Sequence, residues 1–296
     1  MATSFTADDG AALPAANWLP SGTPRAVIVG VHGINDYRAT FAGLGEYLSK
    51  RGFAVYAYDQ RGYGATSSRG HWAGGERLAR DLGNVTRGLH ARYPGLPLYI
   101  IGASLGATVA TVSVTEGWSH ADALVLSAPA VLTRTQVGPI PRGLLWLGAN
   151  LLPRLRFTSA VNGLARDRQL VARLRADPLV LHSTSLAALD GSLHLMQYAE
   201  AAAKRISIPT LVLHGAQDRL IPTAAVRHFA RAIPHATRYE YPEGRHLLLR
   251  DRGAQSIWHD ILGWLERGIT RPQSTVVTSA ELLSPVAAIH GKPRQR

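Results

Sequence analysis

Residues 99–110 decide the fold of this chain, and they read Tyr99-Ile100-Ile101-Gly102-Ala103-Ser104-Leu105-Gly106-Ala107-Thr108-Val109-Ala110. Residues 98–101 are an apolar, β-prone run, residues 102–106 have the pattern G-x-S-x-G, and an apolar helical pattern follows. A serine hydroxyl becomes a useful nucleophile only when it is held out of the sheet, within reach of a base and of donors for an oxyanion. A sharp strand-to-helix turn supplies that position, and its two glycines remove Cβ atoms that would collide there. The stretch therefore predicts a nucleophilic Ser104 between a strand and a helix.

The segments on both sides of this turn alternate between strand and helix patterns. A continuous β-branched run predicts a strand that is buried in a parallel sheet at residues 25–31, and further strands are predicted at residues 53–58, 123–126, 209–213 and 237–241. Helical periodicity falls between them, at residues 39–51, 75–93, 223–232 and 254–267. Residues 2–20 predict two short strands around a turn. This order predicts an α/β fold, a mostly parallel central sheet flanked by helices on both faces.

The alternation stops in residues 129–206, where the pattern is helical, rich in Arg and Leu, and without a convincing strand. We interpret this segment as an inserted helical cap or lid, which leaves residues 1–128 and 207–267 as the two parts of the core. Residues 268–296 are a basic tail that we expect to be flexible, because Pro, Ser, Thr and Arg dominate there. In the cap, the apolar run 143–153 predicts either a helix packed on the main domain or a lid that lines an acyl-chain tunnel or touches a bilayer.

The composition is that of a globular protein, since 46% of the 296 residues are hydrophobic and 18% are charged. The net charge is +12, but the arginines are scattered, so we do not expect nucleic-acid binding; a genome-level bias toward arginine codons and attraction to an anionic membrane surface both explain the charge. The chain has no cysteine, which excludes disulfides and thiolate catalysis. Neither a secretory signal nor an apolar run of about eighteen residues is found, which predicts a cytoplasmic protein, with peripheral membrane contact left open.

Three polar residues that follow predicted strands have the types and the order of a catalytic triad: Ser104, then Asp218, then His246. Ligand sites in parallel sheets lie beyond the carboxyl ends of the strands, so these side chains are expected to meet. In this interpretation His246 takes the Ser104 proton as general base, and Asp218 holds the imidazole tautomer. Asp190 and Asp251 are weaker candidates for the acid, because one lies in the cap and the other follows the histidine.

The oxyanion of the tetrahedral intermediate needs backbone N–H donors. We predict that these are the N–H groups of Leu105, directly after the nucleophile, and of Ile34, in the loop after the strand at residues 25–31. His32 and Asp59 also follow strands, but we interpret both as loop-shaping residues, Asp59 with Arg61 beside it. No second histidine or carboxylate stands at metal-ligand spacing from His32, so no metal and no cofactor are expected.

In these residues the chain resembles the α/β-hydrolases of the monoacylglycerol lipase and lysophospholipase group, also called serine aminopeptidase-like hydrolases. The resemblance covers residues 5–267 and rests on an ordered set of motifs: Asp9-Gly10, Trp18-Leu19-Pro20, Val31-His32-Gly33, Tyr58-Asp59-Gln60-Arg61-Gly62-Tyr63-Gly64, Gly102-Ala103-Ser104-Leu105-Gly106, Leu126-Ser127-Ala128-Pro129-Ala130, Asp177-Pro178-Leu179, His214-Gly215-Ala216-Gln217-Asp218 and His246. The chain departs from the group at Ala103, where histidine is usual. The resemblance implies an α/β-hydrolase fold and esterase or lipase activity on monoacylglycerols or lysophospholipids.

The sequence thus predicts a serine hydrolase that cleaves a lipid ester through an acyl-Ser104 intermediate. One alternative is a small-ester, thioester or peptide hydrolase on the same triad. An alternative of another class is a hydrolase-derived ligand-binding protein. The oligomeric state is not predicted.

Overall fold

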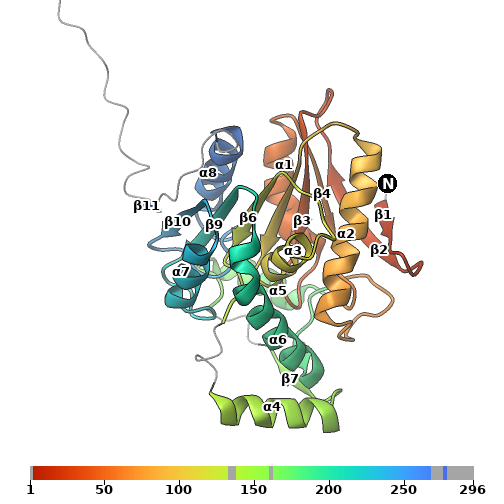
Figure 1. Cartoon of the computed structure of the whole chain (residues 1–296), viewed down its shortest axis with the longest axis vertical. Coiled ribbons are helices and arrows are strands. Elements are labelled where there is room, and N and C mark those ends of the chain that lie inside the picture. The colour runs from red at the N-terminus through yellow and green to blue at the C-terminus, as the bar shows by residue number, and fades with distance from the viewer. Residues whose placement is uncertain (1–2, 133–137, 160–162, 268–275, 279–296) are drawn as a thin grey trace, which may run out of the picture.

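A nine-stranded sheet lies at the centre of the described structure, a computed structural model that describes residues 3–132, 138–159, 163–267 and 276–278. The strands follow the order β1-β2-β4-β3-β5-β6-β9-β10-β11, in which β1 and β4 run antiparallel to β2 and the other pairs are parallel. Helices cover both faces of the sheet (Figure 1). The predicted α/β fold with a mostly parallel, doubly covered sheet is confirmed.

The elements of the core have bounds close to the predicted ones, except for β11, which was not predicted. The strands are β1 (Thr3–Thr6), β2 (Ala12–Trp18), β3 (Ala26–Val31), β4 (Phe53–Tyr58), β5 (Leu98–Ala103), β6 (Ala123–Ser127), β9 (Thr210–Gly215), β10 (Ala236–Tyr241) and β11 (Val276–Thr278). The helices against the sheet are α1 (Ala42–Ser49), α2 (Gly75–Arg92), α3 (Leu105–Thr115), α7 (Thr223–Ala232) and α8 (Ala254–Arg267), and α6 (Leu186–Ala202) packs on α3. Short 3-10 turns precede α1 and follow α6, at η1 (Arg38–Phe41) and η2 (Ala203–Arg205).

The two faces of the sheet carry two separate apolar layers. Val27, Val29 and Val31 of β3 join a cluster with α2, α3, α6 and α7. Ala26 and Ile28 of the same strand point the other way, into a cluster with α1 and α8. Because both faces are covered, all six residues of β3 are buried, and the strand has no polar side. This is why β3 appears in the sequence as a continuous apolar run.

The turn between β5 and α3 is packed too closely for side chains at its two glycines. A Cβ on Gly106 would lie 2.0 Å from the carbonyl oxygen of Val31, and one on Gly102 would lie 2.5 Å from Cα of Ala107. Between them, Ser104 has φ 53° and ψ −119°, a left-handed conformation that is strained for a residue with a Cβ. The first turn of α3 therefore lies directly against the end of β3, and Ser104 stands out of the sheet.

The chain between β6 and β9, which we call the cap segment (residues 129–206), contributes α4 (Pro139–Leu151), α5 (Arg168–Ala176) and α6. It also holds two short strands, β7 (Arg156–Thr158) and β8 (Ser183–Ser185), which pair as an antiparallel ribbon. The prediction that this segment has no strand is therefore wrong. Each strand has three residues, with polar groups in most positions, so neither gives the apolar pattern that identifies a strand from sequence.

The parts of the cap segment differ in how they meet the core. The second half of α6 is buried through Leu195 and Ala199, and Ile206, which follows η2, belongs to the same apolar cluster. In contrast, α4 lies across α6 at the end of the molecule farthest from the sheet (Figure 1), and none of its residues is buried. The proposed domain boundaries at residues 128, 206 and 267 stay predictions.

The expected flexible tail, residues 268–296, lies outside the described residues except for β11, which pairs in parallel with β10. Among the helices that the structure describes, none combines the length and the apolar character needed to cross a membrane.

Candidate active site

Ser104, His246 and Asp218 meet at the carboxyl ends of β5, β10 and β9. Oγ of Ser104 lies 2.8 Å from Nε2 of His246, and Nδ1 of His246 lies 2.8 Å from Oδ2 of Asp218. The three side chains form one hydrogen-bonded line from a buried carboxylate to a hydroxyl, the order in which a general base can be held and used.

The rival carboxylates are engaged elsewhere. Asp190 lies on α6, 3.4 Å from His194 one turn away. Asp251 accepts hydrogen bonds from the backbone N–H groups of Arg166, Asp167 and Arg252, and so fixes the chain that leads into α5.

The environment of Asp218 favours its ionised form. Burial by itself would raise the pKa of this carboxyl, but the hydrogen bond and charge of His246 lower it below its ordinary value. The N–H groups of Leu220 and Ile221 add to this effect, since they donate to Oδ1 at 2.8 and 3.1 Å. Oδ2 thus stays free of a proton and accepts from Nδ1 of His246, which leaves Nε2 as the nitrogen that faces Ser104.

The loop after β3 lies against Ser104. A Cβ added to Gly33 would come within 3.1 Å of Cβ of Ser104, so the Gly33–Ile34 backbone passes close to the hydroxyl. Leu105 is the first residue of α3, and its N–H has no carbonyl of a preceding helical turn to bind. Ile34 and Leu105 both line the cavity above Ser104. Their N–H groups stay the predicted oxyanion donors.

The two other polar residues at strand ends shape loops, as expected. The ring of His32 is fully buried, donates from Nδ1 to the Gly33 carbonyl at 2.7 Å and accepts from the Gln60 N–H at 2.9 Å. Asp59 accepts from the N–H groups of Arg38 and Ala65, at 2.9 and 2.8 Å.

The partner that we expected for Asp59 is different in the structure. The guanidinium of Arg38 forms the ion pair with the carboxylate. Arg61 turns away and binds Asp81 of α2 at 2.9 Å and Asp9 of the β1–β2 turn, also at 2.9 Å. Proximity in sequence therefore suggested the wrong arginine.

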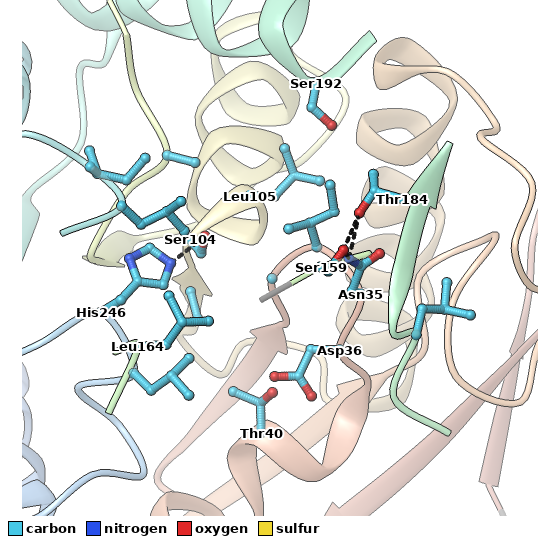
Figure 2. Close-up of a pocket in the computed structure, with 18 of the residues that line it drawn as sticks. Asn35, Asp36, Thr40, Ser104, Leu105, Ser159, Leu164, Thr184, Ser192 and His246 are labelled. Atoms are coloured by element: carbon cyan, nitrogen blue, oxygen red, sulfur yellow. Dashed lines mark hydrogen bonds between the residues drawn. The ribbon is translucent and has the colours of Figure 1, made fainter. Parts of the chain in front are cut away.

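A cavity of about 570 Å³ opens above Ser104. Most of its lining is apolar, and Leu145 of α4 and Leu189, Leu193 and Met196 of α6 belong to it. Figure 2 shows Ser104 and His246 on one side of the cavity and Asn35, Ser159 and Thr184 on the other. Its volume is in the range of small-molecule sites, and the few polar groups in an apolar lining are typical of them.

The polar wall opposite the nucleophile was not predicted from sequence. Nδ2 of Asn35 donates to Oγ of Ser159 at 2.8 Å and to Oγ1 of Thr184 at 2.7 Å. Asp36, the next residue, forms an ion pair with Arg250 of the loop that carries His246. Asn35 lies 124 and 149 residues from its two partners, so no local pattern could have linked them. Within the described part of the chain, no cluster of three or more His, Asp or Glu residues could hold a metal ion.

A doubly covered parallel sheet with Ser, His and Asp in hydrogen-bonded sequence at its carboxyl edge defines an α/β-hydrolase. Residues 22–253 match the family model described as serine aminopeptidase, S33. The chain belongs to this family, and the resemblance inferred from the motifs is confirmed.

The similar proteins include several lipases. A monoacylglycerol lipase of Mycolicibacterium smegmatis is 28% identical over 260 residues, which cover 84% of this chain and 90% of that protein. A monoglyceride lipase of Rattus norvegicus is 26% identical over 278 residues, with 88% and 89% covered. Among solved structures, a monoacylglycerol lipase of Paleococcus ferrophilus superposes with a TM-score of 0.75 at 24% identity and covers 86% of this chain and 98% of that one. A soluble variant of monoglyceride lipase from Saccharomyces cerevisiae, in complex with a substrate analog, gives a TM-score of 0.78 at 20% identity, with 90% and 95% covered.

The opposite electrostatics of two aspartates predict opposite effects of pH on stability. The lowered pKa of Asp218 gives stability that is fully present above the unfolded pKa of about 4 and is lost as pH falls through the folded pKa. Burial raises the pKa of Asp260, so folding becomes more favourable as pH falls and this group takes up its proton. Asp218→Asn should therefore have a lower free energy of unfolding than wild type at neutral pH, and this difference should disappear below about pH 4. The free energy of unfolding of Asp260→Asn relative to wild type should instead decrease as pH drops from 7. Urea denaturation at several pH values measures both, and parallel curves for the two variants would contradict the assignment.

Proposed function

We propose that this protein is a serine hydrolase that cleaves the ester bond of monoacylglycerols through an acyl-Ser104 intermediate. The observation that carries the proposal is the line of hydrogen bonds from Asp218 through His246 to Ser104, which ends on the floor of a largely apolar cavity. The line supplies an activated hydroxyl, and the cavity supplies space for an acyl chain beside it.

In the first half of the reaction, Oγ of Ser104 attacks the ester carbonyl carbon while its proton moves to Nε2 of His246. The charge that forms on the carbonyl oxygen is stabilised by the N–H groups of Ile34 and Leu105. Asp218 stabilises the imidazolium through Nδ1. The tetrahedral intermediate then collapses, the bond to the glycerol oxygen breaks, and His246 returns the proton to the leaving alcohol.

In the second half, water replaces the alcohol. His246 takes a proton from the water, and the water oxygen attacks the acyl carbon. The second tetrahedral intermediate that forms is stabilised by the same two N–H donors. The fatty acid is released when the bond to Oγ breaks and Ser104 regains its proton from His246. All of these steps use side chains and backbone groups of this chain.

The cavity favours a neutral headgroup. Of the cavity-lining residues that the structure describes, Arg250 is the one guanidinium, and its charge is paired with Asp36. A phosphate would have to compete with that carboxylate for the arginine, whereas a glycerol can use both groups through its hydroxyls. Several similar proteins are named as monoacylglycerol or monoglyceride lipases, which supports the same substrate.

Hydrolysis of a long-chain 1-monoacylglycerol, measured as released glycerol, tests the proposal directly. We expect steady turnover by the wild type and a loss of more than about 10,000-fold in Ser104→Ala, because the variant keeps the cavity but has no nucleophile. Esters of p-nitrophenol with acyl chains of two to sixteen carbons should show the highest kcat/KM at medium or long chains. Turnover that survives in Ser104→Ala, or no turnover of any ester by the wild type, would overturn the proposal.

Two neighbouring leucines of α4 differ in their surroundings, since one faces the proposed acyl site and the other the outer surface. Leu145 lines the cavity, whereas Leu144 is 66% exposed. We predict that Leu145→Trp fills the part of the cavity in which the acyl chain would lie. It should lower kcat/KM for a dodecanoyl ester by about 10-fold or more and leave kcat/KM for the acetyl ester unchanged. Leu144→Trp is the matched control and should leave the ratio of the two substrates unchanged. An equal loss on both esters in Leu145→Trp would place the acyl chain elsewhere.

We also propose that the outer face of α4 contacts an anionic membrane surface, where a lipid substrate resides. Ile140, Leu144, Leu147 and Leu151 follow the spacing of one helical face, and each is between 46% and 75% exposed. From residue 123 to residue 166 the sequence has five arginines and no acidic residue. An exposed apolar stripe with basic residues around it is the pattern of a helix that lies in a membrane interface.

Replacing two leucines of this stripe should weaken membrane binding and leave the chemistry intact. Burial of a leucine contributes about 1.5 kcal/mol or more, so Leu144→Asp/Leu151→Asp should reduce affinity for phosphatidylglycerol vesicles by about 100-fold or more. Turnover of soluble p-nitrophenyl butyrate should change less than about twofold, because neither residue lines the cavity. Leu19→Asp alters an exposed leucine outside α4 and serves as control. Equal vesicle affinity of the double variant and the control would contradict the proposed contact.

A further inference from the structure

The loop that follows β3 is tied to four different parts of the molecule by consecutive residues. Asn35 binds Ser159 and Thr184 of the cap segment, and Asp36 pairs with Arg250 beside His246. The hydroxyl of Tyr37 donates to Asp177 at 2.6 Å, and Arg38 pairs with Asp59. The first of these ties is the one nearest to Ile34, whose N–H is a proposed oxyanion donor.

The backbone conformation of Asn35 suits its hydrogen bonds to the cap segment. Its φ is 63°, in the left-handed region that asparagine tolerates better than other residues with a side chain. In this conformation its carbonyl accepts from the N–H of Leu181 at 2.8 Å, while Nδ2 reaches both hydroxyls. The hydroxyls of Ser159 and Thr184 are themselves 2.6 Å apart, which closes a triangle of three hydrogen bonds. We call this set, Asn35, Ser159 and Thr184, the Asn35 clasp (Figure 2).

The clasp joins an exposed strand of the ribbon, β7, and the buried Thr184 of β8 to a tightly packed loop. All three residues of β7 are exposed, and Phe157 is 50% exposed. Ser159 directly follows β7, and Thr184 is the central residue of β8. The loop itself is fixed at its first residues, because His32 donates to the Gly33 carbonyl and the Gln60 side chain donates to the His32 carbonyl at 2.6 Å. A shift of the ribbon would therefore act on the loop at Asn35, one residue from Ile34.

We propose that Asn35 is a positioning residue that holds the Ile34 N–H in place through the β7–β8 ribbon, so that the oxyanion site is complete only when the ribbon is seated. This inference rests on the proposed function, since it assumes that Ser104 is acylated and that Ile34 donates to the oxyanion. It assigns to the ribbon a part in the chemistry as well as in covering the cavity. Removal of one oxyanion donor lowers rates about 100- to 1,000-fold, so displacement of a donor should have a smaller effect of about 10- to 100-fold.

Two sets of changes break the clasp from its two sides. Asn35→Gly removes the side chain and keeps a residue that adopts a left-handed φ without strain. Ser159→Ala/Thr184→Val removes both hydroxyls and leaves Asn35 in place. The control is Ser183→Ala in β8, which removes an acceptor of the Arg156 side chain at 2.8 Å and leaves the clasp intact.

The first measurement is the rate at which a small alkyl fluorophosphonate labels Ser104. Oγ forms a bond to phosphorus, fluoride leaves, and the serine proton passes to His246, so the reaction uses the oxyanion site whatever the natural ester is. We expect Asn35→Gly and Ser159→Ala/Thr184→Val each to react about 10- to 100-fold more slowly than wild type, and Ser183→Ala to match it. The combined variant should be no slower than the slower of the two, because both break the same tie.

The second measurement separates positioning from substrate binding and from general damage. With p-nitrophenyl butyrate, both clasp variants should lose kcat with KM within about twofold, and the pH at which kcat/KM reaches half its plateau should not move, because the base is untouched. Thermal unfolding identifies a variant that fails to fold. In that case, the variant that breaks the clasp from its other side tests the inference.

The outcomes distinguish this inference from the proposed function. If wild-type Ser104 is neither labelled nor active on any ester, the proposed function is wrong and the inference falls with it. If wild type reacts and both clasp variants react equally fast, only the inference is overturned. Slow labelling in Asn35→Gly but not in Ser159→Ala/Thr184→Val, or additive effects in the combined variant, would also overturn it, because Asn35 would then act without the ribbon.

Discussion

The close contact between the first turn of α3 and the end of β3 is the constraint on which the site depends. No side chain fits at Gly106, because Val31 contributes a carbonyl oxygen 2.0 Å from where its Cβ would stand. This contact sets α3 against the loop that follows β3, and it forces Ser104 into its left-handed turn. The hydroxyl, the N-terminus of α3 and the Gly33–Ile34 backbone are thereby brought within a few ångströms of one another by packing alone.

Much of this arrangement could be predicted from sequence because it follows from local rules. The apolar runs of β3 and β4 are continuous since both faces of the sheet are covered, and the helical stripe of α8 repeats with the period of its buried side. Ser104, Asp218 and His246 could be placed together because the carboxyl ends of parallel strands share one edge. That inference needs only the order of the strands and the turn that follows each one.

What could not be predicted depends on side-chain partners that are distant in the chain. The β7–β8 ribbon consists of two three-residue strands with little hydrophobic pattern, so its pairing is decided by the elements around it. Arg38 rather than Arg61 reaches Asp59, because η1 carries Arg38 over the carboxylate while Arg61 faces Asp81. The Asn35 clasp belongs to the same class, since its members come from three separate segments. Sequence thus places Ser104, His246 and Asp218 together but not the groups that hold their surroundings.

The two faces of α4 link this site to the place where its substrate would be found. One face contributes Leu145 to the cavity, and the opposite face presents an apolar stripe to the exterior. A helix that is apolar on both sides suits the proposed position between an acyl chain and a lipid surface. The ribbon follows α4 directly in the chain, since β7 begins five residues after Leu151, and the ribbon in turn binds Asn35. A lipid surface that binds α4 would therefore also act on the loop that carries the proposed oxyanion donor.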